Sequence, residues 1–363
     1  MNVFLLSLGG GIASLYAILS TQQKRNMIKG AKDRVSSYFT SSQDFSNNTV
    51  DFVLDNFFEK NNGLERIETP SIAMIRNAAK DPIEKNRLTD QLKISIMTKL
   101  FATMYTIPLI FVFNRIQVNI IGRYCYLDFI VQKDKQQVPK RLVDETTEKQ
   151  YFSFINHLFD QTFNRFVSII QNHLEIHLKD WKIEEQSSYE SFLRLMLKIR
   201  SSFESSNILS SNHKDSLLKY LIPDEDEGGN SSNDSLTMLF NETRNIFESQ
   251  KFYGILKECI NQSFLEFTKN IRNDFESNKK SGAAMAINDN IIIPSFLPIE
   301  MEIPKPLSTM HNIVLLPKIN KLVSQISKTS QRLDIITKMS QLESVKSFNY
   351  SILTNDLNFN KVF

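Results

Sequence analysis

Apolar residues recur at steps of three or four along two long segments of this chain, and this spacing is the strongest constraint on its fold. Such spacing places a continuous apolar stripe on one face of an α-helix. The first stripe contains Phe152, Ile155, Phe159, Phe163, Phe166, Ile170 and Leu174. The second contains Phe252, Leu256, Ile260, Phe264, Phe267, Ile271 and Phe275. Each stripe predicts one amphipathic helix that packs against a core.

Shorter segments with the same helical period cover residues 189–203, 236–247, 313–326 and 333–348. No segment convincingly alternates apolar and polar residues between hairpin turn signals, which is the pattern of strands. Glycine and proline number only 10 each in 363 residues, well below their average usage of roughly 7% and 5%. The sequence therefore predicts an all-α fold, and its 27 phenylalanines supply the apolar volume for a core.

Charge and cysteine content exclude several classes of protein. The net charge of +3 is too small for bulk attraction to nucleic acid. Two cysteines, Cys125 and Cys259, cannot form a disulfide framework or a four-cysteine zinc site. A reducing compartment is the simplest inference.

The first 20 residues contain no charged side chain. As a helix, residues 3–19 would be about 25 Å long, at the short end of what crosses a bilayer. The basic residues that follow are Lys24, Arg25, Lys29, Lys32 and Arg34. By the positive-inside rule, this pattern predicts a retained single-pass anchor with the downstream chain in the cytosol. A cleaved signal peptide or a segment lying on the membrane surface is the alternative.

A second apolar run extends over residues 94–113 and is interrupted by Lys99. From Leu100 to the next charge, Arg115, the chain would form only about 21 Å of helix, against a hydrocarbon core of about 30 Å. A helix that is apolar on nearly all faces is otherwise one that other helices surround. We therefore predict a buried helix here and not a second span.

The remaining segments show where helices end. Residues 223–234 are acidic, contain two glycines and lack apolar residues, which predicts a surface loop. Residues 278–290 are another candidate for a loop. Four prolines within residues 294–306 predict an extended connection. The predicted organisation is an anchor (1–20), a basic juxtamembrane segment (21–45) and one all-α domain (46–363).

Residues that could carry chemistry are few. His173 and His177 lie four apart, but no glutamate directly follows the first histidine as in a metalloprotease helix, so a packing role is favoured. Both cysteines lie in apolar helical patterns that favour structural thiols. The sequence has no phosphate-binding loop, nucleophile elbow or EF-hand loop. We therefore predict a non-enzymatic protein without a cofactor; a membrane-bound metal hydrolase using the two histidines is the enzymatic alternative.

One segment is more specific than these patterns. RIQVNIIGRYCYLD, residues 115–128, closely resembles the signature of the peroxin 3 family of peroxisomal biogenesis factors. The resemblance includes DQLKISIMTKLFATMYT (90–106), LIPDEDE (221–227) and LFNETRNIFESQKF (239–252), with weaker similarity near residue 320 and at 345–348. It covers nearly the whole chain, including the anchor followed by basic residues.

The resemblance implies an integral peroxisomal membrane protein whose cytosolic domain is built around one long central helix. It implies docking of peroxin 19, a soluble chaperone-receptor that carries newly made peroxisomal membrane proteins, through its N-terminal amphipathic helix. The expected partners are peroxin 19 and peroxisomal membrane lipids, with neither nucleic acid nor a small-molecule substrate. A membrane tether or inheritance adaptor that binds other partners is the alternative.

Carried over to this chain, the family's groove for the partner helix falls on Lys85, Leu88, Thr89, Leu92 and Lys93. The two leucines lie one turn apart and would line the groove, while the lysines would pair with acidic residues of the partner. Alternatively, the leucines are ordinary core residues and the lysines are solvated.

This chain departs from the family at one groove position. Familiar members place a tryptophan where this chain has Thr89, and its only tryptophan, Trp181, lies elsewhere in the sequence. Neighbouring apolar residues or a co-adapted partner helix would have to replace that aromatic anchor.

The signature block has no evident catalytic logic. Arg115, Asn119 and Gly122 step along one face of a helix, and Asp128 ends the block. Because polar side chains on a buried helix need partners, we expect Arg115 and Asn119 to bond neighbouring helices or chain termini. We expect Gly122 to permit close helix approach, so the block is interpreted as structural, with a second binding surface as the alternative.

Overall fold

The computed structural model describes residues 29–30, 32–60, 63–134, 143–155, 163–206, 234–279 and 309–355. The anchor predicted for residues 1–20, the loop over 223–233 and the proline-rich connection at 294–306 lie outside these residues. Within them, a helix covers residues 32–55 (helix 32–55) and crosses the predicted domain boundary at residue 46 without a break. That boundary stays a prediction.

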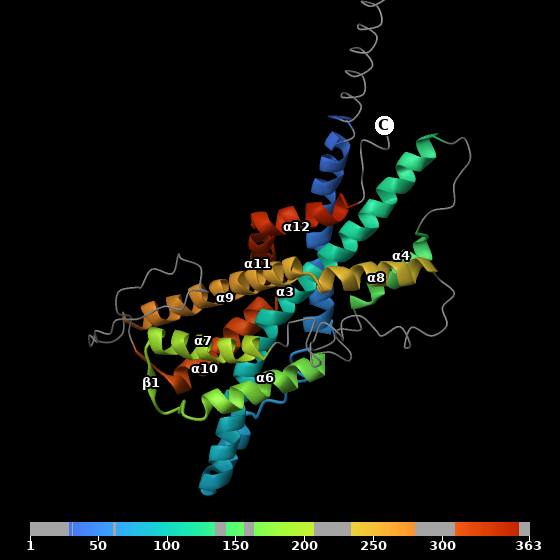
Figure 1. The fold of residues 1–363 in the computed structure, drawn as a ribbon. Coiled ribbons are helices and arrows are strands. Elements are labelled where there is room, and N and C mark those ends of the chain that lie inside the picture. Colours follow the sequence, from blue (N-terminus) through green and yellow to red (C-terminus); the bar gives the residue numbers. More distant parts are fainter. Residues whose placement is uncertain are drawn as a thin grey trace, which may run out of the picture.

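The elements that follow helix 32–55 are almost all helical (Figure 1). In chain order they are η1 (Asn56–Lys60), α2 (Ile72–Asn77), η2 (Ala78–Lys80), α3 (Pro82–Asp134), α4 (Glu145–Ser153), α6 (Phe163–Leu178), β1 (Gln186–Ser187), α7 (Tyr189–Ser205), α8 (Asp234–Phe247), α9 (Gln250–Lys279), β2 (Met310–His311), α10 (Asn312–Ile326), α11 (Thr329–Gln341) and α12 (Glu343–Leu353). The strands form one two-residue antiparallel pair, in which Gln186 faces His311. The all-α prediction is confirmed.

The 53-residue helix α3 runs from one end of the molecule to the other (Figure 1). Its start is fixed by Asp81, whose side chain accepts hydrogen bonds from the backbone of Ile83 and Glu84, and by Pro82 at the first helical position. Pro108 removes one backbone bond from the helix interior, a cost that burial on all sides offsets. Helices α6, α9, α10 and α12 pack against α3.

Among the described residues, one helical segment, Pro82–Leu127, is long and apolar enough to cross a membrane. However, 94% of its most apolar 18-residue stretch is buried inside the protein. An aromatic ring of α9 packs against it: the ring centroid of Phe264 lies 5.5 Å from that of Phe101 and 5.4 Å from that of Tyr105. The prediction of a buried helix over residues 94–113 is therefore confirmed.

The helices predicted at 189–203, 236–247, 252–275 and 313–326 are confirmed as α7, α8, α9 and α10. Two predicted helices are interrupted in the structure. The segment 333–348 is divided by Leu342, whose extended backbone (φ −60°, ψ 126°) ends α11 and precedes α12. On either side of the break, α11 packs mainly against α9 and α12 mainly against α3.

The predicted helix at 152–174 is likewise wrong in its continuity. Helix α4 ends at Ser153 and α6 begins at Phe163, with residues 156–162 outside the described part. Helix α4 packs mainly against α8 and also against α3, whereas α6 packs mainly against α3 and also against α7. The two halves of the apolar stripe therefore have different main neighbours.

Candidate functional site

The first turns of α3, where the sequence places the partner-binding residues, extend beyond α6 at the lower end of the view (Figure 1). Lys85 is exposed, Thr89 is half-buried, and Leu92 is half-buried against the main core. Leu88, by contrast, is only 5% exposed. Ile83, on the first turn, is 82% exposed, so this end of the helix offers apolar surface to solvent.

Lys93 differs from Lys85 although both were expected at the rim of the groove. Its side chain is 4% exposed, and its Nζ donates to the backbone carbonyls of Leu178 at 2.9 Å and Trp181 at 3.1 Å. A further contact joins Nζ to the Asp90 carboxylate at 2.9 Å. In this structure Lys93 therefore satisfies carbonyls at the end of α6 and in the loop after it.

The same loop connects α3 to the start of α10. The Asn312 side chain donates to the carbonyl of Lys182 at 2.7 Å, and the Ile313 backbone N–H donates to Ile183 at 3.0 Å. The first turn of α10 leaves Ile313 61% and Val314 46% exposed. The loop after α6 thus contacts α3 through Lys93 and the start of α10 through Asn312 and Ile313. The sequence does not identify Ile313 and Val314 as surface residues, because both lie in a segment with the helical period of a buried stripe.

A recess of about 810 Å³ lies on another side of α3, between the segment 66–74 and α6. Leu88 is the one predicted groove residue that lines it. Arg87, also in its lining, is paired with Glu84 at 2.6 Å. The predicted groove residues therefore do not share one surface: Leu88 faces this recess.

The signature block contributes to a polar seam between α3 and helix 32–55. Arg115, 1% exposed, donates to Gln43 and, at 2.5 Å, to Asn47. Gln43 also donates to Asn119 at 3.2 Å and accepts from Asn349 of α12 at 3.1 Å. Burial lowers the pKa of Arg115 to about 10. These side chains tie three helices together, with Arg115, Asn119 and Asn349 buried and Gln43 and Asn47 half-buried.

Gly122 and Asp128 complete the block. A Cβ added at Gly122 would lie 3.0 Å from the Tyr38 ring and 3.3 Å from Leu353, so both neighbours approach the helix closely here. Asp128 lies on α3, but its side chain is outside the part that the structure describes.

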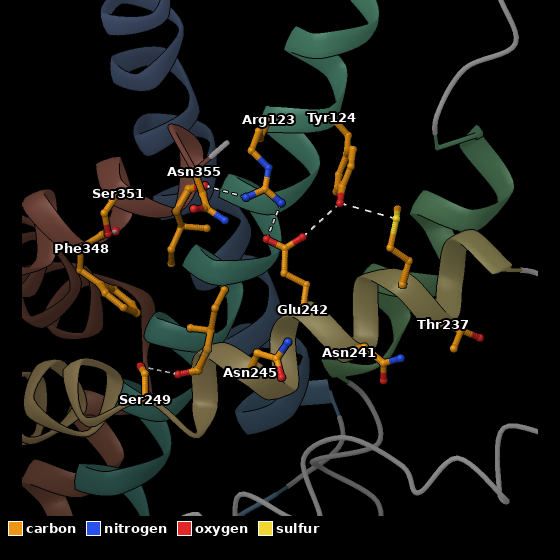
Figure 2. A pocket seen from close by; sticks show the side chains of 13 residues that line it. Arg123, Tyr124, Thr237, Asn241, Glu242, Asn245, Ser249, Phe348, Ser351 and Asn355 are labelled. Carbon is orange, nitrogen blue, oxygen red and sulfur yellow. Dashed lines mark hydrogen bonds and ion pairs between the residues drawn. The ribbon is translucent and has the colours of Figure 1, made fainter. Parts of the chain in front are cut away.

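A cleft of about 870 Å³ opens between α3, α8 and α12 (Figure 2). Its lining is rich in amides and hydroxyls, and we refer to it as the amide cleft. The lining residues are Arg123, Tyr124, Thr237, Met238, Asn241, Glu242, Asn245, Ile246, Ser249, Phe348, Ser351, Ile352 and Asn355.

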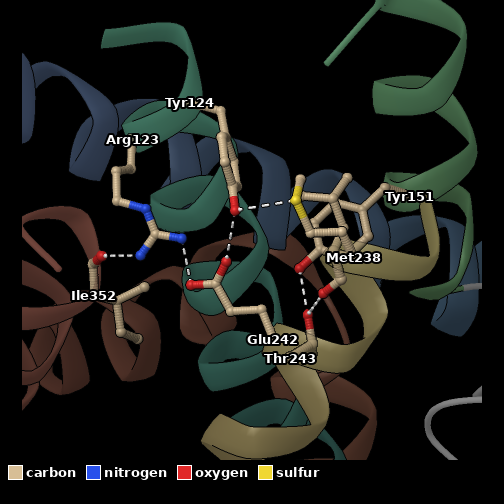
Figure 3. A network of polar contacts seen from close by, with 8 residues as sticks. Arg123, Tyr124, Tyr151, Met238, Glu242, Thr243 and Ile352 are labelled. Carbon is tan, nitrogen blue, oxygen red and sulfur yellow. Dashed lines mark hydrogen bonds and ion pairs between the residues drawn. The ribbon is translucent and has the colours of Figure 1, made fainter. Parts of the chain in front are cut away.

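The charges of the amide cleft satisfy one another (Figure 3). Arg123 pairs with Glu242 and donates to the carbonyl of Ile352 at 3.2 Å, while the Tyr124 hydroxyl donates to Glu242 at 3.2 Å. Burial and the nearby Glu242 carboxylate raise the pKa of Tyr124. The cleft thus holds α3, α8 and α12 together and presents no unpaired acid or base in its described lining.

The remaining candidates for chemistry are dispersed. The His173 Nδ1 lies 3.0 Å from the Ser202 hydroxyl, and desolvation lowers the pKa of both His173 and His177. Cys259 is buried, which raises its thiol pKa, whereas Cys125 is exposed. Among the described residues, no three histidine, cysteine, aspartate or glutamate side chains are grouped to hold a metal ion.

Comparisons with known proteins assign this chain to a family. A family model described as Peroxin-3 matches residues 17–355. Peroxisome biogenesis factor 3 of Dictyostelium discoideum is 50% identical over 379 aligned positions, which cover 100% of this chain and 92% of that relative. Peroxisomal biogenesis factor 3 of Homo sapiens is 28% identical over 280 positions, covering 73% of each chain. Peroxisome biogenesis protein 3-1 of Arabidopsis thaliana is 22% identical, over 74% of this chain and 67% of the relative. This chain belongs to the peroxin-3 family of peroxisome biogenesis factors.

Proposed function

We propose that this chain is a docking receptor in the peroxisomal membrane that binds the N-terminal amphipathic helix of peroxin 19. In this proposal, the uncharged residues 1–20 anchor the chain and the helical domain lies in the cytosol. Docking delivers peroxisomal membrane proteins that peroxin 19 carries. Family membership and the names of the relatives support the role in peroxisome biogenesis.

The observation that supports the receptor role is apolar surface in solvent at two helix starts, with Ile83 82% exposed on α3 and Ile313 61% exposed on α10. We define the receptor groove as Lys85, Thr89 and Leu92 of α3 together with Ile313 and Val314 of α10. A helix that docks in a groove needs apolar contacts at intervals of one turn and charges at the rim. In this proposal, Leu92, Ile313 and Val314 supply the apolar contacts, and the exposed Lys85 supplies a charge at the rim.

The structure changes how the groove should be tested. A Leu88→Asp substitution would place a carboxylate at a position that is 5% exposed, so it would destabilise the fold whether or not a partner binds. Ile313, at 61% exposed, accepts an aspartate in contact with water. Ile176, 69% exposed on the side of α6 opposite its buried residues, is a matched control.

The experiment measures binding of a peroxin 19 N-terminal peptide to the full chain in lipid nanodiscs by calorimetry, with empty discs as the blank. Ile313→Asp should weaken binding at least tenfold, because a charge in a desolvated apolar contact is costly. Ile176→Asp should bind as the wild type does. Unchanged binding by Ile313→Asp would refute the groove. A wild-type chain that binds no peptide would refute the receptor role and favour the tether alternative.

A further inference from the structure

Three aromatic side chains lie seven residues apart on helix 32–55, and all three are exposed. Tyr38 is 38% exposed, Phe45 is 60% exposed and Phe52 is 61% exposed. Residues seven apart lie on one face of an α-helix, with a drift of about 20° for each heptad. The three rings therefore form one stripe that is about 21 Å long. We refer to these three residues as the aromatic stripe.

The aromatic stripe carries no charge. Between Tyr38 and Phe52 the chain has two charged residues, Asp44 and Asp51. Each directly precedes a phenylalanine of the stripe and therefore lies about 100° away from it around the helix. Asp51 pairs with Arg332 of α11 at 2.7 Å, so its charge is directed to the bundle.

The hydroxyl side chains beside the aromatic stripe have hydrogen-bond partners within the same helix. The Thr49 Oγ1 donates to the carbonyl of Phe45 at 2.9 Å, and the Ser41 Oγ donates to the carbonyl of Ser37 at 3.2 Å. A contact that covers these hydroxyls therefore leaves neither donor unpaired. This face of the helix can be removed from water at little cost.

The place of helix 32–55 in the chain favours a second copy of the chain as the group that covers the stripe. This helix begins shortly after the anchor proposed for residues 1–20, and its first turns extend beyond α12 (Figure 1). Two copies anchored in one membrane enter the cytosol in the same direction, so their helices 32–55 are parallel. A two-fold axis along the membrane normal then places each ring of the stripe beside the same ring of the other copy.

The area of the aromatic stripe indicates how strong this contact is. Since an aromatic side chain buries about 150–250 Å², the exposed parts of the three rings offer roughly 300 Å² on each copy, or about 600 Å² in a dimer. A specific dimer in solution buries at least about 1,000 Å². The stripe alone is therefore too small to hold two copies together in water. Confinement of both anchors to one membrane raises their effective concentration and makes up the difference.

We propose that the chain forms a parallel homodimer in the membrane, in which the aromatic stripe of one copy packs against that of a second copy. Phe45 and Phe52 form the centre of the contact. Asn48, exposed beside Phe45, meets Asn48 of the second copy, and such an amide pair fixes the register of two parallel helices. This inference goes beyond the docking of peroxin 19 and rests on the proposed function only for the anchor.

Cross-linking of the full chain in phosphatidylcholine vesicles tests the geometry of the contact. In a Cys125→Ser background, which removes the exposed native thiol, Asn48→Cys places a thiol beside the stripe. Thr40→Cys is the matched control, because Thr40 is exposed on the same helix but lies about 140° from Phe45. We expect a short bismaleimide to join two copies at position 48 at least about fivefold more efficiently than at position 40. Equal efficiencies would indicate random collisions and would overturn the proposal.

Energy transfer between copies that carry a donor or an acceptor fluorescent protein after residue 363 measures the strength of association in the same vesicles. Phe45→Ser with Phe52→Ser should lower the association constant at least tenfold. The control, Ile176→Ser with Tyr253→Ser, removes two exposed apolar side chains from α6 and α9 and should leave the constant unchanged. All four side chains are exposed, so circular dichroism should show wild-type helicity for both double variants.

The outcomes separate this inference from the proposed function. A dimer that persists without the two phenylalanines overturns the inference, as does a wild-type chain that shows no energy transfer at any lipid-to-protein ratio. Either result leaves the receptor role standing. If alkaline carbonate extracts the wild-type chain from the vesicles, the anchor is wrong, and both the inference and the membrane receptor are overturned.

Discussion

Lys93 and Lys85 lie two turns apart on α3, and replacing each with methionine should affect stability to very different extents. Methionine keeps an apolar stem of similar length and removes the charge with its hydrogen bonds. At Lys93 the change removes both bonds to the carbonyls of Leu178 and Trp181. At Lys85 it removes a charge that lies in solvent.

The magnitude follows from these contacts. Hydrogen bonds from a charged donor contribute about 1.5–3 kcal/mol each. The contact of Lys93 with Asp90, which is 64% exposed, adds at most about 1 kcal/mol. Relief from burying the ammonium offsets part of this sum. We therefore expect Lys93→Met to lower the free energy of unfolding by about 2–4 kcal/mol, and Lys85→Met to change it by no more than about 0.5 kcal/mol.

The assay is urea denaturation of the full chain in detergent micelles, followed by far-UV circular dichroism and by Trp181 emission. The tryptophan signal of Lys93→Met should change at a lower urea concentration than that of the wild type, because the loop loses its attachment to α3. If Lys93→Met unfolds with the wild-type midpoint and instead loses peptide affinity, Lys93 acts at the rim of the groove and the structural role derived above is wrong.

Two further predictions concern distant contacts of the bundle. The Arg332 side chain has no exposed surface and pairs with Asp51 at 2.7 Å and with Asp55 at 3.2 Å. Arg332→Met should lower the free energy of unfolding by about 3 kcal/mol, because two carboxylates lose their cation. A loss below about 1 kcal/mol in urea denaturation would contradict this. Burial raises the pKa of Tyr189 to about 12 from 10.0, so the neutral phenol stabilises the fold below pH 10 and this contribution disappears as the pH rises from about 10 to about 12. Between about pH 9 and 11, where urea midpoints can be measured, the free energy of unfolding of Tyr189→Phe should fall less than that of the wild type. Equal decreases in the two proteins would contradict a raised pKa of Tyr189.

Much of the helical architecture was predictable because its signal is local. The helices at 189–203, 236–247, 252–275 and 313–326 have apolar residues every three or four positions, and one packing partner suffices for each stripe. The length of the apolar run at 94–113 was enough to favour a buried helix over a span. Packing against four other helices then confirmed it.

The interruptions at 342 and after 153 were not predictable from that signal. An apolar stripe continues through both positions, and periodicity reports that a residue is buried, not which helix covers it. The helices on either side differ in their main neighbour: α11 packs mainly against α9 and α12 against α3, while α4 packs mainly against α8 and α6 against α3. Only the tertiary arrangement specifies those neighbours.

In the candidate site, too, some features follow from the sequence and others only from the tertiary structure. From the sequence, Lys85 and Lys93 were equivalent basic residues on one helix. The structure separates them because a segment 85 residues away places the carbonyl of Leu178 beside Lys93. The position of the loop that carries Trp181 has the same origin, since this loop is bonded to α3 on one side and to α10 on the other.

The sequence by itself determined the helical class, the buried central helix and, through its signature block, the family. The tertiary structure decided which polar and aromatic side chains are partners. Local periodicity encodes how a segment folds and which face is buried. Hydrogen bonds such as those of Lys93 and Arg332 join segments 85 and 281 residues apart, and such pairings exist only once the helices have packed.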